Sequence, residues 1–219
     1  MRKIAIVLAI FFSSPASAKV IFGYPDFSPT IFKDDSGKMA GRMVPKLKKL
    51  FWKFDQPVKT VGLSTTQYVA ALADGSIHFG LGNHEIAAMK KITYLGKSTT
   101  MISRIVVLSD SKAPTKIYKD KKLRLALIDS YNYMGHRRKL STSKLGHSIV
   151  NVRSKSQGIA LLESKKVDAF LAYEEEVSYL KDTNKFSQVT IKESTIHYVV
   201  SKKAPNAKAL LETINRLTQ

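Results

Sequence analysis

Three aromatic side chains lie close together near the start of the chain. Tyr24, Phe27 and Phe32 stand between a short apolar strand, Val20–Phe22, and an amphipathic helix that begins at about Met43. Aromatic rings in such a loop can stack on a flat or apolar ligand and seal one side of it. The alternative is that the rings fold back as a lid over the hydrophobic core.

Further polar and aromatic side chains follow three other predicted strands. Each group stands directly after the carboxyl end of its strand, which is where ligands bind in parallel α/β sheets. We therefore expect these groups to line a binding site. The candidate ligand contacts at the strand ends are Asn83, His84, Glu85, Ser130, Tyr131, Asn132 and Tyr173.

Each of these candidates also has a structural alternative. Ser130 begins a predicted helix, whose free amide groups would point at an anion, but serine caps helices in any protein. Tyr173 can simply shield a sheet edge, and His84 is a lone histidine that a surface position explains equally well.

Signals of catalysis or of a cofactor are weak. The chain has no G-x-S-x-G motif, and G-L-G-N-H-E lacks the third glycine of a dinucleotide-binding loop. The five histidines show no metal-ligand spacing, and the absence of cysteine excludes disulfides and thiolate ligands. We expect no metal and no cofactor. Glu85 is the one carboxylate placed to serve an enzyme.

The first eighteen residues are typical of a secretory signal peptide. Arg2 and Lys3 precede the apolar run Ile4–Phe12, and Ala16–Ala18 provides a small-residue cleavage site. Cleavage would leave a chain that starts at Lys19, with no cysteine for a lipid anchor. The sequence therefore predicts a monomer free in the periplasm.

The chain is strongly basic, with a formal net charge of +19, or +17 once Arg2 and Lys3 are removed. Such an excess favours anionic partners through the summed electric field. The basic residues are spread along the chain without a tail-like block, so we expect no nucleic-acid partner. A basic surface with no function of its own explains the charge equally well.

The predicted elements alternate between strand and helix. After the first strand and helix come a strand at Val58–Leu63, a helix at Gln67–Ala73 with hydroxyl caps before it, and a strand at Ile77–Leu81. This βαβαβ order indicates a parallel sheet with helices on its faces. The remaining predicted elements are strands at 102–108, 123–128, 167–171 and 196–200 and helices at 133–140 and 207–217.

A weak internal repeat indicates a second lobe of similar architecture. The segments Val69–Leu81 and Ile159–Leu171 superpose at an offset of 90 residues, each with a helix end, a polar turn and an apolar strand. The alternative is chance, because this pattern is common.

The chain resembles the type 2 periplasmic solute-binding proteins, the amino-acid-binding-like family that serves ABC importers. Y-P-D-F-S-P followed by D-S-G-K-M-A-G-R resembles the family's opening motif, and A-D-G-S-I-H-F-G-L-G-N and L-L-E-S-K-K-V-D-A-F-L-A resemble its two strand motifs. The resemblance implies an α/β fold of two mostly parallel lobes joined by two crossover segments. It places lobe 1 at residues 19–103 and 195–219 and lobe 2 at 106–189, with Asp168 in a structural role.

The chain departs from the family at both charged anchors for an amino acid. The arginine that holds the ligand carboxylate falls on Ala88 or Met89, and the acid that pairs with the ammonium falls on Tyr173. The resemblance thus implies a solute-binding protein that closes its lobes around a small anionic or aromatic solute rather than a standard α-amino acid. An ABC permease or a sensor receptor would be its partner.

Two other functions stay open at this point. One is a protein that no longer transports and binds an anionic polymer or membrane surface through its charge. The other is a dehydratase-like enzyme on the same fold, which would depend on Glu85 lying in the cleft.

Overall fold

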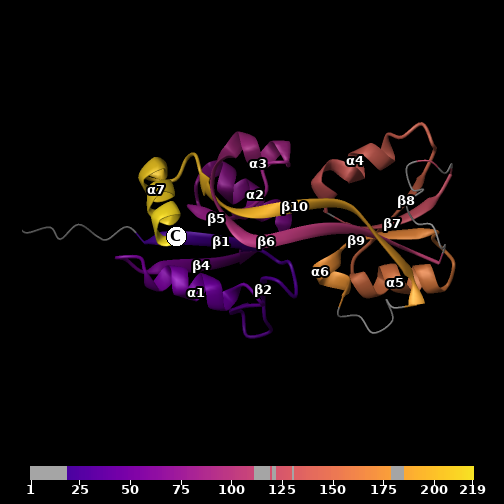
Figure 1. Ribbon diagram of the computed structural model, residues 1–219, viewed down its shortest axis with the longest axis horizontal. Coiled ribbons are helices and arrows are strands. Elements are labelled where there is room, and N and C mark those ends of the chain that lie inside the picture. The colour runs from indigo at the N-terminus through magenta and orange to yellow at the C-terminus, as the bar shows by residue number, and fades with distance from the viewer. Residues whose placement is uncertain (1–18, 111–118, 120–121, 130, 179–184) are drawn as a thin grey trace, which may run out of the picture.

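The computed structural model of the chain describes residues 19–110, 119, 122–129, 131–178 and 185–219 (Figure 1). The predicted signal peptide and Ser130 lie outside these residues. No helix in the described part of the chain is long and apolar enough to cross a membrane. The fold is α/β with two lobes, as the sequence predicted, while the residue bounds of the lobes stay a prediction.

One eight-stranded sheet runs through both lobes in the order β4-β1-β5-β10-β6-β9-β7-β8. Lobe 1 contains β1 to β5, α1 to α3 and α7, and lobe 2 contains β7 to β9 and α4 to α6 (Figure 1). Strands β4, β1 and β5 are mutually parallel, as are β9, β7 and β8. Each lobe therefore has the parallel core that ligand-binding α/β folds use.

Helices cover both faces of the sheet in lobe 1. The strands are β1 (Val20–Pro25), β4 (Val58–Leu63) and β5 (Phe79–Gly82), and a hairpin of β2 (Phe32–Lys33) and β3 (Met39–Ala40) follows β1. Alternate side chains of β1, including Phe22, pack with Leu47 and Ile214 under α1 (Val44–Trp52) and α7 (Ala207–Leu217). The opposite face packs against α2 (Thr65–Asp74) and α3 (Ala87–Ile92).

Helix α2 begins two residues before the predicted start at Gln67 and ends one residue after the predicted end at Ala73. The Ser64 hydroxyl accepts a hydrogen bond from the Gln67 amide, and the Gln67 side chain accepts one from the Ser64 amide in return. Gly75 ends the helix in the left-handed conformation, at φ 87°. These reciprocal bonds satisfy amide groups that the helix itself cannot.

Replacing Ser64 by alanine should lower the free energy of unfolding by about 1 kcal/mol, because the first turn of α2 loses its cap. Urea unfolding measures this loss. The matched control is Thr66→Ala in the same turn, where the exposed side chain should change stability by less than about 0.5 kcal/mol. Equal losses in the two variants would contradict the capping role.

Lobe 2 repeats the architecture of lobe 1, a parallel sheet with helices on both faces. Its strands are β7 (Arg124–Ile128), β8 (Ser148–Val152) and β9 (Ala169–Tyr173). Its helices are α4 (His136–Ser141), α5 (Lys155–Glu163) and α6 (Glu174–Val177), with α4 on one face of the sheet and α5 and α6 on the other (Figure 1). The single predicted helix at 133–140 is therefore a short 3-10 turn, Tyr133–Gly135, followed by α4.

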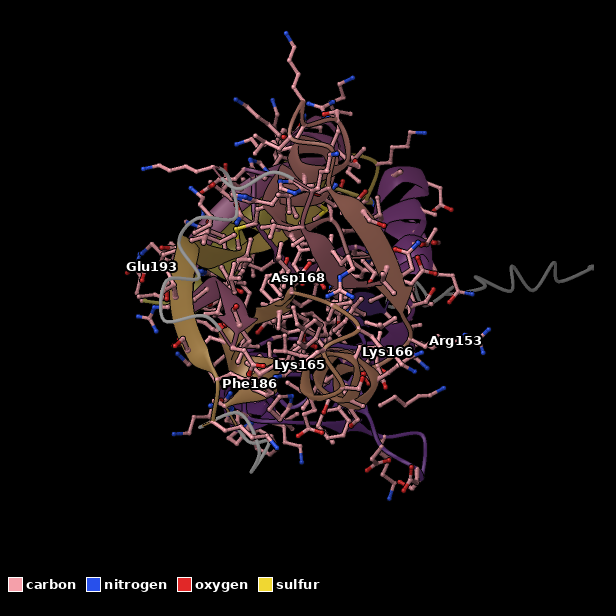
Figure 2. The ribbon with its side chains drawn as sticks, turned by 90° about the vertical axis from the view of Figure 1, so that its right-hand side faces the viewer. Arg153, Lys165, Lys166, Asp168, Phe186 and Glu193 are labelled. Carbon is pink, nitrogen blue, oxygen red and sulfur yellow. The ribbon has the colours of Figure 1, made fainter. Side chains whose placement is uncertain are left out.

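The two lobes share the helix-turn-strand unit of the predicted repeat. In lobe 1 it is α2 and β5, and in lobe 2 it is α5 and β9. Lys165 stands where the offset of 90 places Gly75, and both residues have positive φ, 55° and 87°. Asp168 follows this turn and accepts two bonds from the Arg124 side chain and one from its amide. Figure 2 places Asp168 and Lys165 at the outer end of lobe 2, away from lobe 1, which agrees with a structural role for Asp168.

The lobes are joined by two long antiparallel strands. These are β6 (Thr93–Ser109) and β10 (Ser187–Ser201), which pair from Ser109 with Ser187 to Thr93 with Ser201. Both are longer than the apolar runs predicted from the sequence, because their solvated middle parts satisfy each other's backbone groups through pairing. Register shifts near Thr190 and His197 interrupt the ladder, as expected of a connection that bends.

Candidate functional site

A cavity of about 680 Å³ lies between the lobes. Lobe 1 contributes the loop after β1, one face of α2 along most of its length, the end of β5 and helix α3, and strands β6 and β10 add further lining residues. Lobe 2 contributes three side chains. Representative lining residues are Phe27, Ile31 and Met89 from lobe 1, Met101 from β6, and Asn132 and Tyr173 from lobe 2.

Four of the predicted contacts line this cavity, namely Phe27, Asn83, Asn132 and Tyr173. The structure brings them together from residues far apart in the sequence. The lining is largely apolar, and its polar groups are hydroxyls and amides. Among the described lining residues Lys91 alone carries a charge.

The other predicted contacts lie elsewhere. Tyr24 is buried in the core of lobe 1, 6.3 Å from the Phe22 ring between centroids, and Phe32 is half-buried on β2 outside the cavity lining. The His84 ring bonds the Thr93 hydroxyl at 2.9 Å. Glu85 lines an adjoining cavity, and Tyr131 packs behind Phe27.

An aromatic cluster joins the two lobes at one side of the cavity. The Phe27 ring meets Tyr173 edge-on with centroids 4.9 Å apart and lies 6.2 Å from Tyr131. Tyr133 stacks on Tyr173 at 5.5 Å. Since Phe27 belongs to lobe 1 and the tyrosines to lobe 2, the two contacts of Phe27 form across the cleft and would change when the lobes move apart.

A buried carboxylate, Glu176, lies beneath this cluster. Its Oε1 accepts a hydrogen bond from the Tyr131 hydroxyl at 2.8 Å and lies 3.8 Å from the Lys155 ammonium, while its Oε2 is buried with no hydrogen-bond partner among the described residues. Burial raises the pKa of Glu176 to about 7, although Lys155 opposes the rise. Lys155 also donates to the Ser28 carbonyl of lobe 1 at 2.8 Å, so the Lys155 ammonium links Glu176 of lobe 2 to lobe 1.

A chain of hydrogen bonds connects the end of β5 to β10. The buried Asn83 amide donates to the Ser194 hydroxyl at 2.5 Å, and Ser194 donates to Glu85 at 2.8 Å. Lys192 pairs with the same carboxylate at 2.6 Å. The hydrogen bond from Lys192 lowers the pKa of Glu85, so this carboxylate is a weaker base than an ordinary glutamate.

Several lining residues were not predicted. Thr65 and Ile86 line the cavity, as does Met134, which has a positive φ of 53° in the turn after β7. The sequence indicates Thr65 only as one of the hydroxyl caps before the helix predicted at Gln67–Ala73. The run of three glutamates after β9 was the one sequence signal for Glu176, and no local pattern indicated that Lys155 of α5 would reach it.

Ala88, Met89 and Tyr173 all line the cavity. These are the positions where the family resemblance places an arginine and an acid. Within the described residues, no group of three or more His, Asp or Glu side chains is arranged to hold a metal ion.

Two lobes on a shared sheet, two connecting strands and a cleft between them define the type 2 periplasmic-binding-protein fold. Structural comparison confirms this fold. An ancestral arginine-binding protein bound to arginine is 19% identical, with 91% of this chain and 90% of that one covered and a TM-score of 0.69. An ancestral amino acid-binding protein, described as a precursor of cyclohexadienyl dehydratase, is 15% identical over 91% and 87% of the chains, with a TM-score of 0.67.

The arginine-binding protein of T. maritima in its holo form is also similar. It is 17% identical over 91% of this chain and 88% of that one, with a TM-score of 0.63. No protein-family model and no curated protein sequence matches the chain.

Proposed function

We propose that this chain is a periplasmic solute-binding protein that closes its two lobes around a small apolar or aromatic solute. The signal peptide expected at residues 1–18 would export it, and an ABC permease or a sensor receptor would receive the solute. In this reading the protein binds and releases its solute unchanged and acts as a monomer.

The observation that carries the proposal is the cavity between the lobes. Its volume of about 680 Å³ lies in the range of small-molecule sites. Residues of both lobes line it, so a bound solute would contact both and favour the closed arrangement. Phe27 and Tyr173 already meet across the cleft and supply aromatic surface from each side.

The lining argues against the cationic solutes of the structural neighbours. An enclosed ammonium or guanidinium group needs an acidic partner, because burying an unpaired charge costs several kcal/mol. The described lining residues include no aspartate or glutamate, and Glu85 beside the cavity is already paired with Lys192. We therefore propose that arginine and other standard α-amino acids are not the solute.

Replacing Phe27 by alanine should weaken solute binding roughly tenfold, because one aromatic face of the cleft is lost. Isothermal titration of the chain from Lys19 with a panel of aromatic and aliphatic acids, alcohols and amino acids would identify the solute and give this ratio. The control is Phe32→Ala, a half-buried phenylalanine outside the cavity lining, which should leave affinity within about twofold.

Small-angle scattering provides the second measurement. A solute that binds both lobes should make the protein more compact at saturation. Tight binding of arginine would contradict the proposed solute class. A panel without any hit, together with unchanged scattering, would contradict the binding function itself.

A further inference from the structure

A second cavity opens beside the first, between α3 of lobe 1 and α4 of lobe 2 (Figure 1). Its volume is also about 680 Å³. The two cavities share Ile86, Ala88, Asn132 and Met134 in their linings, so they adjoin each other. A solute seated at this boundary would contact both cavities.

The second cavity is basic where the first is apolar. Arg138, Lys139 and His136 line it from α4, and Lys192 lines it from β10. Glu85 is its one acid within the described lining, and that charge is matched by the ion pair with Lys192 at 2.6 Å. Arg138 and Lys139 are exposed and have no ion-pair partner within the described part of the chain, so the cavity keeps an excess of positive charge.

This arrangement suits an anionic group better than a neutral one. An arginine side chain can donate two parallel hydrogen bonds to a carboxylate, and charge-assisted bonds are about twice as strong as neutral ones. A partly enclosed cleft also screens such an attraction less than open solvent does. His136 is buried and its pKa is lowered, first by burial and then by Lys139 and Lys192. Lys192 is paired with Glu85, so the excess positive charge comes from Arg138 and Lys139.

We propose that the solute is an apolar carboxylic acid, with its body in the first cavity and its carboxylate between Arg138, Lys139 and Lys192 in the second. This inference rests on the solute-binding function proposed above. It adds a reason for closure, because Arg138 and Lys139 belong to lobe 2 and the apolar body contacts lobe 1.

The test compares 3-phenylpropanoate with its neutral amide, 3-phenylpropanamide, by isothermal titration of the chain from Lys19. The acid should bind at least roughly tenfold more tightly than the amide at low salt. The double variant Arg138→Gln, Lys139→Gln should lose that ratio and keep the affinity for the amide. The control, Lys48→Gln with Lys49→Gln on α1, removes the same charge from exposed positions outside both cavities and should keep the ratio.

Each outcome has a distinct meaning. Equal binding of acid and amide to the unmodified protein would overturn the carboxylate site and leave the solute-binding function standing. If both double variants lose the preference for the acid over the amide, the carboxylate site is also overturned. The overall positive charge of the protein would then be the cause of the preference. Failure of both compounds and of the whole solute panel to bind would remove the proposed function, and this inference with it.

Discussion

Replacing Glu176 by glutamine should stabilise the protein above pH 7, by up to about 3 kcal/mol. In the folded protein this carboxyl is buried, its Oε2 has no hydrogen-bond partner within the described part of the chain, and its pKa is raised from 4.5 to about 7. A raised pKa means that the folded state holds the proton more tightly than the unfolded chain. The stability contributed by the group is therefore complete below pH 4.5 and is lost as the pH rises through 7.

The groups around Glu176 determine the size of this effect. Lys155 and the Tyr131 hydroxyl favour its ionised form, while burial, Glu175 and Asp26 disfavour it. Glutamine has a similar shape and no charge at any pH, so the variant should lack this part of the pH dependence.

Urea unfolding at pH 4.5, 6 and 8 measures the difference between the two proteins. The difference in free energy of unfolding, variant minus unmodified protein, should rise mainly between pH 4.5 and 8. The matched control is Glu212→Gln on the exposed face of α7. Its free energy of unfolding should change with pH in the same way as that of the unmodified protein. A constant difference between Glu176→Gln and the unmodified protein over this range would show that Glu176 does not hold its proton more tightly when folded.

Replacing Gly80 by alanine should destabilise the protein by about 3 kcal/mol or more, because the new methyl group has no space. Gly80 lies in β5 at the centre of lobe 1. A Cβ there would collide with the Tyr68 hydroxyl and would lie 2.7 Å from the Gly23 carbonyl oxygen. Neither neighbour can move easily, since Gly23 is part of β1 and the buried Tyr68 hydroxyl donates to the Leu81 carbonyl at 2.6 Å.

A double-variant cycle identifies the obstacle. Tyr68→Phe alone should cost about 1 kcal/mol through its lost hydrogen bond. Combined with Gly80→Ala, it should cost less than the sum of the two single variants, because the hydroxyl that meets the methyl group is gone. The contact with the Gly23 carbonyl remains, so the double variant should still be less stable than the unmodified protein. Additive losses would show that Tyr68 is not the obstacle. Urea unfolding again provides the measurement.

The local elements of the fold could be read from the sequence because their signals are short-range. Ser64 caps α2 and Gly75 ends it, and α7 has the predicted bounds, Ala207–Leu217. In each case, backbone hydrogen bonding and side-chain periodicity over a few residues decide the outcome. The family resemblance added the order of these elements, and with it the two-lobed fold.

The use of each aromatic ring was harder to predict. Tyr24 and Phe27 are three residues apart in the same predicted loop, yet Tyr24 is buried in the core and Phe27 lines the cleft. The reason is that β1 continues to Pro25, so Tyr24 follows the alternation of Val20 and Phe22 onto the face under α1. The sequence analysis ends the strand at Phe22. The predicted loop therefore starts too early and includes Tyr24, which belongs to the strand.

The sequence by itself determined most of the longer strands and helices, their order and the strand ends from which ligand contacts come. Strand β8, the β2–β3 hairpin and the short helices α3 and α6 were not predicted. Only the tertiary structure decided which side chains meet there. Asn83 bonds Ser194, Lys155 reaches both Ser28 and Glu176, and Phe27 packs on Tyr173, although these partners stand 21 to 146 residues apart in the chain. Such contacts depend on how β6 and β10 set the two lobes against each other, and no pattern within a few residues carries that information.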